Sequence, residues 1–186
     1  MQKAGSSILL SASDLVGHLH CRHLTALDID NANGKLDKPK FWDPFQEILQ
    51  ERGRRHEEGF IKHLKASGFA VTVIDGVGVH EGTLARTREA MAAGAEIIVQ
   101  GAFRSGGWAG RTDVLRRVAT SSDLGPWSYE VIDAKLARET KGGAVLQLCL
   151  YAELLAAALF LNVERAGEIV RSNELPLDED LAQTHL

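Results

Sequence analysis

Two short stretches in the middle of the chain decide how it is expected to fold: Gly110-Arg111-Thr112-Asp113-Val114-Leu115 and Tyr129-Glu130-Val131-Ile132-Asp133-Ala134-Lys135-Leu136. Both are rich in Val, Ile, Leu or Tyr, which predicts short strands. Side chains alternate across a strand, so Asp133 and Lys135 are expected on one face and Ala134 on the other. Charges on a strand with buried character are costly unless a metal, substrate or partner charge compensates them. Asp113, Asp133 and Lys135 together therefore suit a hard divalent cation such as Mg²⁺.

Two further motifs lie on either side of these acids in a fixed order. Gly53-Arg54-Arg55-His56-Glu57 comes before them, and Gln147-Leu148-Cys149-Leu150-Tyr151 comes after them. Over about residues 11–161 the chain resembles the RecB-like branch of the PD-(D/E)XK nuclease superfamily. The resemblance implies an α/β fold with a restriction-endonuclease-like core, in which a mixed central sheet is flanked by helices on both faces.

The resemblance also implies a metal site and a catalytic lysine. The side chains of His56, Asp113 and Asp133, with the backbone carbonyl of Ala134, would bind Mg²⁺ or Mn²⁺. Asp113, Asp133 and Lys135 would be catalytic, with the lysine orienting the attacking water and offsetting phosphate charge. The alternative is that Asp133 and Lys135 form an exposed ion pair of little energetic value.

Nucleic-acid contacts are expected from one helix face and from local basic residues. Gln147 and Tyr151 are four residues apart and share a helix face, and the resemblance implies that they contact the substrate backbone or position the lysine. The alternative is that Tyr151 belongs to the edge of the core. The net charge of −4 gives no global attraction for DNA, so Arg54 and Arg111 are the candidate phosphate ligands within a local patch.

The composition indicates a single globular domain spanning residues 1–186. The chain is 45% hydrophobic and 25% charged, which is ordinary for such a domain. Its two cysteines indicate a reducing compartment, and no signal peptide is expected, so we predict a cytoplasmic protein. The apolar stretch from Val145 to Val163 is interrupted by polar residues and predicts a buried helix rather than a membrane span. The tail 162–186 is expected to be poorly ordered or truncated.

Local patterns predict the remaining elements. A capped helix is expected from Ser13-Asp14, and a long helix from Pro44 to about Ser67. Strands are predicted at 69–74, 96–103, 109–118, 128–136 and, in the tail, 168–172, and further helices at 83–93 and about 142–161. The long helix is predicted to face inward along a stripe formed by Phe45, Leu49, His56, Phe60 and Leu64.

Other metal centres are disfavoured by the positions of the cysteines. Some relatives in this branch hold an iron–sulfur cluster with one N-terminal cysteine and a C-terminal trio, but here the trio is absent, so no cluster is expected. A zinc site at His18, His20, Cys21 and His23 lacks the usual separated pairs of ligands.

Three functions remain open. The leading hypothesis is a metal-dependent nuclease that hydrolyses DNA phosphodiester bonds in repair or recombination. The second is a catalytically silent nucleic-acid-binding module that docks to a helicase. The third is a metal-independent α/β domain whose acids form ordinary surface pairs.

Overall fold

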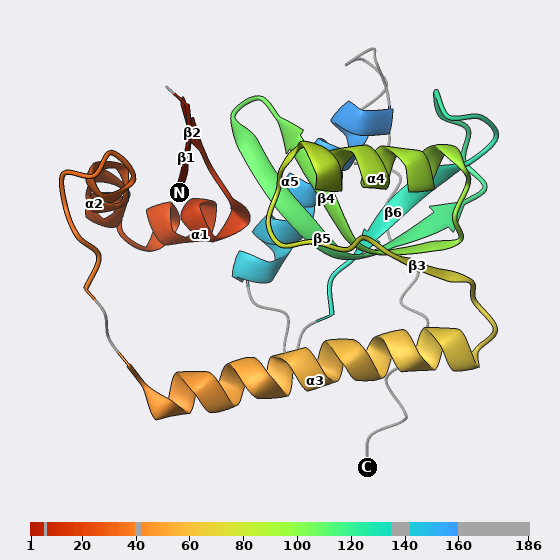
Figure 1. Cartoon of the computed structure of the whole chain (residues 1–186), viewed down its shortest axis with the longest axis horizontal. Helices are drawn as coiled ribbons and strands as arrows, with labels where there is room; N and C mark the ends of the chain where they lie inside the picture. The colour runs from red at the N-terminus through yellow and green to blue at the C-terminus, as the bar shows by residue number, and fades with distance from the viewer. Residues whose placement is uncertain (6, 40–41, 135–141, 160–186) are drawn as a thin grey trace.

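A four-stranded mixed sheet lies at the centre of the molecule in the computed structural model (Figure 1). The structure describes residues 1–5, 7–39, 42–134 and 142–159. The sheet has the order β3-β4-β5-β6, with β3 parallel to β4 and the other pairs antiparallel. The bounds are Val71–Val73 for β3, Ile97–Ser105 for β4, Trp108–Val118 for β5 and Ser128–Ile132 for β6.

The predicted hairpin at the middle of the chain is confirmed. Ser105 pairs with Trp108 across Gly106 and Gly107, which both adopt positive φ angles that favour glycine. The predicted strand 128–136 is shorter in the structure, because β6 ends at Ile132. Asp133 and Ala134 therefore follow the strand rather than belong to it.

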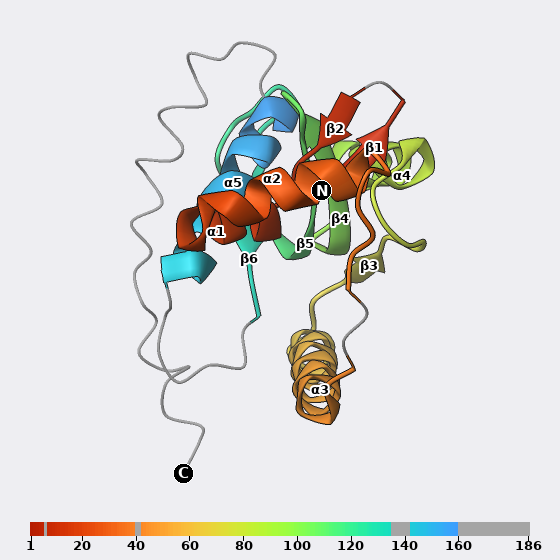
Figure 2. The same cartoon turned by 90° about the vertical axis from the view of Figure 1, so that its left-hand side faces the viewer.

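Helices cover both faces of the sheet, as the sequence predicted. On one face, α4 (Glu81–Ala92) and α5 (Gly142–Leu159) share an apolar core with the sheet. On the other face lies α3 (Pro44–Ala66), and Figure 2 shows it apart from the two other helices. The two cores include Ile98, Phe103, Leu115, Met91, Leu154 and Leu155 on the α4–α5 side, and Ile97, Val99, Val114 and Leu64 on the α3 side.

Helix α5 is a core helix over its C-terminal half. Its length and hydropathy alone would allow it to cross a membrane, which is weak evidence because core helices pass the same test. Tyr151, Leu154, Leu155 and Leu159 are buried among the core residues of the sheet, whereas Val145 is exposed. The prediction of a buried apolar helix is confirmed for these C-terminal turns.

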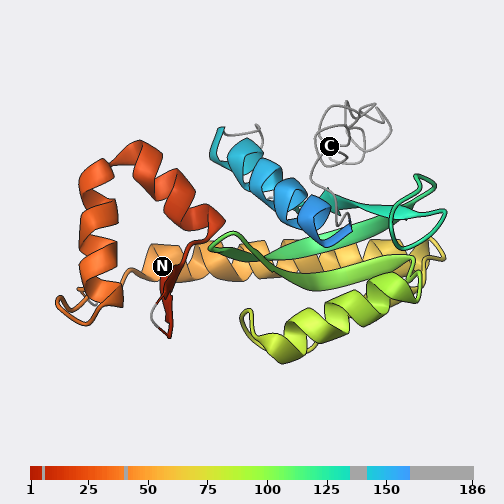
Figure 3. The same cartoon turned by 90° about the horizontal axis from the view of Figure 1, so that it is seen from above.

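An N-terminal layer packs beside the sheet (Figure 3), and of its elements the sequence patterns predicted only the helix α1. A two-stranded hairpin is followed by two helices: β1 (Gln2–Ala4), β2 (Ser7–Leu9), α1 (Ala12–His20) and α2 (Arg22–Ala32). Helix α1 begins two residues earlier than expected, because Ser11 and Asp14 form a capping box in which Ser11 donates to the Asp14 carboxylate. The hairpin is joined to the sheet by the backbone of Leu10, which forms hydrogen bonds with Gly107 and Ala109.

The predicted inward stripe of α3 is correct for two of its five residues. Phe60 and Leu64 pack against the sheet, as expected. Phe45 and Leu49 are 65% and 46% exposed, and His56 is exposed as well, so these three assignments are wrong. The physical reason is that only the C-terminal part of this long helix supplies side chains to the apolar core of the sheet.

Several predictions concern residues outside the described ranges. The proposed catalytic residue Lys135 lies outside these ranges. The possible strand at 168–172 also lies outside them, with the whole tail from residue 160 onward.

Candidate functional site

Asp113 and Asp133 come together at the end of β6. The last paired residues of β5 and β6 are Val114 and Ile132, so one further step along the antiparallel register brings Asp113 opposite Asp133. The backbone N–H of Ala134 donates a hydrogen bond of 3.0 Å to Oδ2 of Asp113. Two acids that are 20 residues apart in sequence thus form one half-buried pair.

The surroundings of the pair disfavour two negative charges. Burial raises the pKa of Asp113 to about 7, with further increases from the charge of Asp133, a hydrogen bond with its carboxyl group and the charge of Glu57. The Ala134 N–H lowers this pKa, but by less. A cation placed between the carboxylates would remove the repulsion, so the pair has the charge and the oxygen donors that a hard divalent cation needs.

Glu57 is the acidic residue near the site that the sequence patterns missed. The prediction placed it off the inward stripe of α3, but its side chain is half-buried and its charge acts on Asp113. At about 100° per residue, Glu57 lies only about 20° around the helix axis from Leu64, whereas His56 lies about 80° away. Glu57 is seven residues, or about two helical turns, before the buried Leu64, and this spacing would have placed it on the inward side of α3.

The structure does not bring His56 to the acid pair. His56 is exposed on α3, and within the described ranges no three His, Cys, Asp or Glu side chains are grouped so that they could hold a metal ion. The predicted convergence of His56 with Asp113 and Asp133 is thus not seen among the described residues, and its role as a metal ligand stays a prediction. The same observation applies to the zinc site considered among His18, His20, Cys21 and His23.

Gln147 and Tyr151 of α5 lie beside the acid pair. Nε2 of Gln147 donates to Oδ1 of Asp133 at 3.2 Å and to the hydroxyl of Tyr151 at 3.5 Å. Tyr151 is buried, and burial raises the pKa of its hydroxyl, as does the charge of Asp113 and then that of Asp133. The interpretation of Tyr151 as a core residue is confirmed for its ring. Its hydroxyl lies beside the Gln147 amide, and its contact with the substrate or with Lys135 stays a prediction.

Arg111 binds the protein backbone. Its guanidinium donates to the carbonyl of Ile74 at 2.7 Å, to that of Gln100 at 2.8 and 3.1 Å, and to that of Gly76. Burial lowers its pKa, and the nearby charge of Arg86 lowers it further. With all three nitrogens donating to carbonyls, the side chain has a structural role, and the geometry does not support the predicted phosphate contact.

The Gln100 carbonyl held by Arg111 belongs to a strained part of β4. Gln100 has a φ of 60°, an uncommon conformation for a residue that is not glycine. By the register of β4 and β5, it lies opposite Asp113, between the Val99–Val114 and Gly101–Thr112 pairs. Strained backbone of this kind gathers at functional sites, because the surrounding structure must hold it in place.

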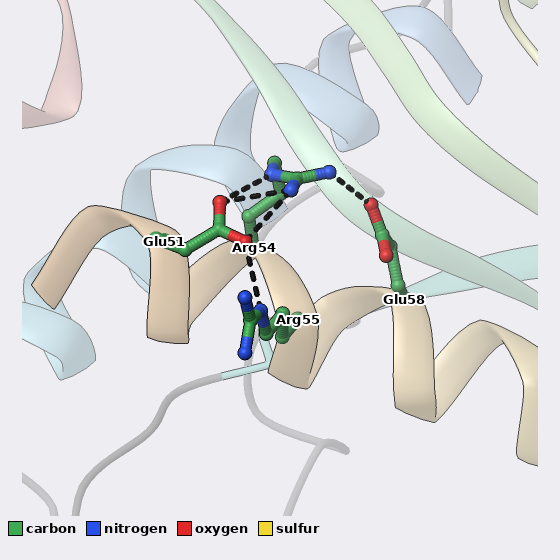
Figure 4. A network of polar contacts seen from close by, with 4 residues as sticks. All are labelled: Glu51, Arg54, Arg55 and Glu58. Atoms are coloured by element: carbon green, nitrogen blue, oxygen red, sulfur yellow. Dashed lines mark hydrogen bonds and ion pairs between the residues drawn. The ribbon is translucent and has the colours of Figure 1, made fainter. Parts of the chain in front are cut away.

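Arg54 lies on the exposed surface of α3 in a network of charges (Figure 4). Its guanidinium contacts Glu51 at 2.8 Å and Glu58 at 2.6 Å, while Arg55 contacts Glu51 at 2.7 Å. The hydrogen bond with Glu51 is the main cause that raises the pKa of Arg54. A phosphate group would have to compete with two carboxylates for this arginine.

Comparison with protein-family models, with curated proteins and with solved structures finds no significant match to this chain. The functional assignment therefore depends on the acid pair and on the residues that contact it.

Proposed function

We propose that this chain is a metal-dependent nuclease that hydrolyses phosphodiester bonds of DNA. The proposal depends mainly on one observation. Asp113 and Asp133 meet in a half-buried position, where burial and mutual repulsion raise the pKa of Asp113 to about 7. The groups that raise the pKa of Asp113 include a third carboxylate, that of Glu57, and carboxyl groups with a strongly raised pKa are frequent at functional sites.

The donor set fits a hard divalent cation such as Mg²⁺ or Mn²⁺. We propose that Asp113 and Asp133 would hold it, with the carbonyl of Ala134 as a further oxygen donor and with Glu57 near enough to add negative charge. When bound, such a cation stabilises charge on the phosphate oxygens and lowers the pKa of a coordinated water.

In this proposal, Gln147, Tyr151 and Lys135 have different roles. Gln147 holds Asp133 in position through its amide, and the same amide contacts the Tyr151 hydroxyl. The hydroxyl can then donate to a substrate oxygen at the edge of the site. Lys135, two residues after Asp133 in the sequence, would orient the water that attacks phosphorus and offset the charge that develops as the P–O bond breaks.

The finer parts of the assignment belong to the same proposal. We infer a PD-(D/E)XK-type core of the RecB-like branch, and a role in DNA repair or recombination in the cytoplasm, with a helicase or another repair protein as partner. The sequence motifs carry these inferences, together with the mixed sheet flanked by helices.

The first test incubates the purified chain with end-labelled single-stranded and double-stranded DNA in Mg²⁺, in Mn²⁺ or in EDTA. We expect cleavage with either metal, none in EDTA, and a loss of at least a hundredfold in Asp133→Asn. Binding of DNA without cleavage under all conditions would instead favour the silent nucleic-acid-binding module.

A second test asks which residue of α3, Glu57 or His56, contributes to metal binding beside Asp113 and Asp133. Glu57→Gln should lower Mg²⁺ affinity in calorimetry, because it removes the negative charge that acts on Asp113. The matched control is Glu58→Gln, one residue further along, where the carboxylate is exposed and bound to Arg54. We expect no effect from this control or from His56→Ala. Loss of metal affinity in His56→Ala alone would restore the original ligand prediction.

A further inference from the structure

A cavity of about 350 Å³ lies between the N-terminal hairpin and the sheet. Its apolar wall includes Leu10, Val79, Ala109 and Tyr151, and its polar wall includes Gln2 and Ser11. This volume is at the small end of the range for ligand sites, so it suits one compact group rather than a duplex.

The walls of the cavity are held from two sides. On one side, Leu10 donates to the Gly107 carbonyl at 2.9 Å and accepts from the Ala109 N–H at 2.8 Å, which joins the N-terminal hairpin to the β4–β5 turn. On the other side, Arg111 binds the carbonyls of Ile74 and Gly76 and so holds the start of the loop that carries Val79. Main-chain contacts of this kind keep a pocket formed before any ligand arrives.

Tyr151 connects the cavity to the acid pair. Its ring packs against Gly110, where an added Cβ atom would come within 2.5 Å of Cε1, and both residues line the cavity. Its hydroxyl lies 3.5 Å from the Gln147 amide nitrogen that also donates to Asp133. A group bound in the cavity would therefore be separated from the acid pair by one aromatic side chain.

We propose that this cavity binds a single unpaired nucleoside of the substrate strand, which deepens the proposed function and rests on it. Pockets for unpaired bases combine an aromatic or apolar wall with a few groups that hydrogen-bond the base edge. Here the Tyr151 and Leu10 side chains provide the first, and the Gln2 amide and Ser11 hydroxyl provide the second. Asp14 is the one acidic residue among the described residues that line the cavity, and it is bound to the Met1 ammonium at 2.7 Å, so its charge is compensated.

The proposal predicts a preference for strands with an unpaired base next to the scissile phosphate. A base held beyond Tyr151 would place the adjoining phosphate toward Asp113 and Asp133. In a duplex, the base pair would have to be broken before the base could enter the cavity. Single-stranded DNA should therefore be the better substrate.

The test fills the cavity with a large side chain and uses a matched control on the same loop. Val79→Trp places an indole in the cavity, whereas Val77→Trp makes the same chemical change at a residue that is 93% exposed and does not line it. Gln2→Trp introduces the same large side chain at a second residue that lines the cavity, on β1, and so shows whether a folding defect explains the result of the first variant. Two quantities are measured: binding of deoxyadenosine monophosphate in EDTA by saturation-transfer NMR, and KM for single-stranded DNA in Mg²⁺.

We expect Val79→Trp and Gln2→Trp to lose nucleotide binding and to raise KM at least tenfold, with Val77→Trp like the parent. Parent-like binding and KM in both folded filling variants would overturn the cavity proposal while leaving the nuclease proposal standing. Nucleotide binding that is lost on filling, in a parent chain that cleaves no DNA, would support the cavity and refute the nuclease.

Discussion

The most direct test of the acid pair is the isosteric change Asp113→Asn in the metal-free protein. The folded-state pKa of Asp113 is raised from 3.8 to about 7, so folding favours its protonated form. The contribution of Asp113 to stability should be fully present below about pH 4 and be lost as the pH rises through about 7. Asparagine keeps the shape, still accepts from the Ala134 N–H and can donate to Asp133, but carries no charge.

The structure gives the size of the expected effect. A rise from 3.8 to about 7 is roughly three units, and at about 1.4 kcal/mol per unit the ionised form costs about 4 kcal/mol. Asp113 is only partly buried, so solvent screening reduces this to about 2 kcal/mol. For a chain of this length, that corresponds to a melting temperature about 4–8 °C higher in Asp113→Asn at pH 8.

The assay is thermal unfolding followed by circular dichroism in EDTA at pH 4 and pH 8. We expect the variant to be more stable at pH 8 and equal to the parent at pH 4. Asp75→Asn is the matched control, because Asp75 is exposed, and it should change neither value. Mg²⁺ should stabilise the parent at pH 8 more than the variant. A variant that is less stable than the parent at pH 8 would refute the electrostatic reasoning.

Three further predictions concern residues around the pair. Gly110→Ala should lower the free energy of unfolding by about 1–3 kcal/mol, because its Cβ would meet the Tyr151 ring, and the loss should shrink in a Tyr151→Leu background when both are measured by urea unfolding. Arg111→Lys should lower the free energy of unfolding by about 2–4 kcal/mol, because backbone carbonyls lose their donors. The salt dependence of DNA binding, measured by anisotropy, should stay unchanged, and a reduced salt slope would show a phosphate contact. Lys135→Ala should keep the circular dichroism spectrum and Mg²⁺ affinity but lose most cleavage, and near-normal cleavage would exclude its catalytic role.

Much of the fold is determined by local patterns of residue types. The glycines at 106 and 107 between two apolar runs predict the β4–β5 hairpin, and the structure has it. The runs around Asp113-Val114-Leu115 and Ile132-Asp133 predict two neighbouring strands, and the structure has them, with Asp113 in β5 and Asp133 directly after β6. These features depend on backbone preferences and side-chain alternation within a few residues, so they can be read without knowing the rest of the molecule.

Other features were decided only when distant parts of the chain packed together. The side of α3 that faces the sheet depends on how Leu64 packs with Ile97 and Val99, and a rotation of one residue exchanges His56 for Glu57 near the acid pair. The role of Arg111 likewise depends on carbonyl groups more than ten residues away in the sequence.

The N-terminal hairpin, and the cavity it forms with the sheet, depend on backbone hydrogen bonds between Leu10 and the β4–β5 turn. Such bonds join main-chain groups that every non-proline residue possesses, so residue type does not reveal them. The amino-acid sequence by itself therefore determined the two strands and the acids that lie in one of them and directly after the other. The tertiary structure alone decided that Glu57 of α3 lies near these acids, that Arg111 binds backbone carbonyls and that a cavity forms beside Tyr151. The rotation of α3 about its axis and the pairing of backbone groups are set by packing between distant parts of the chain.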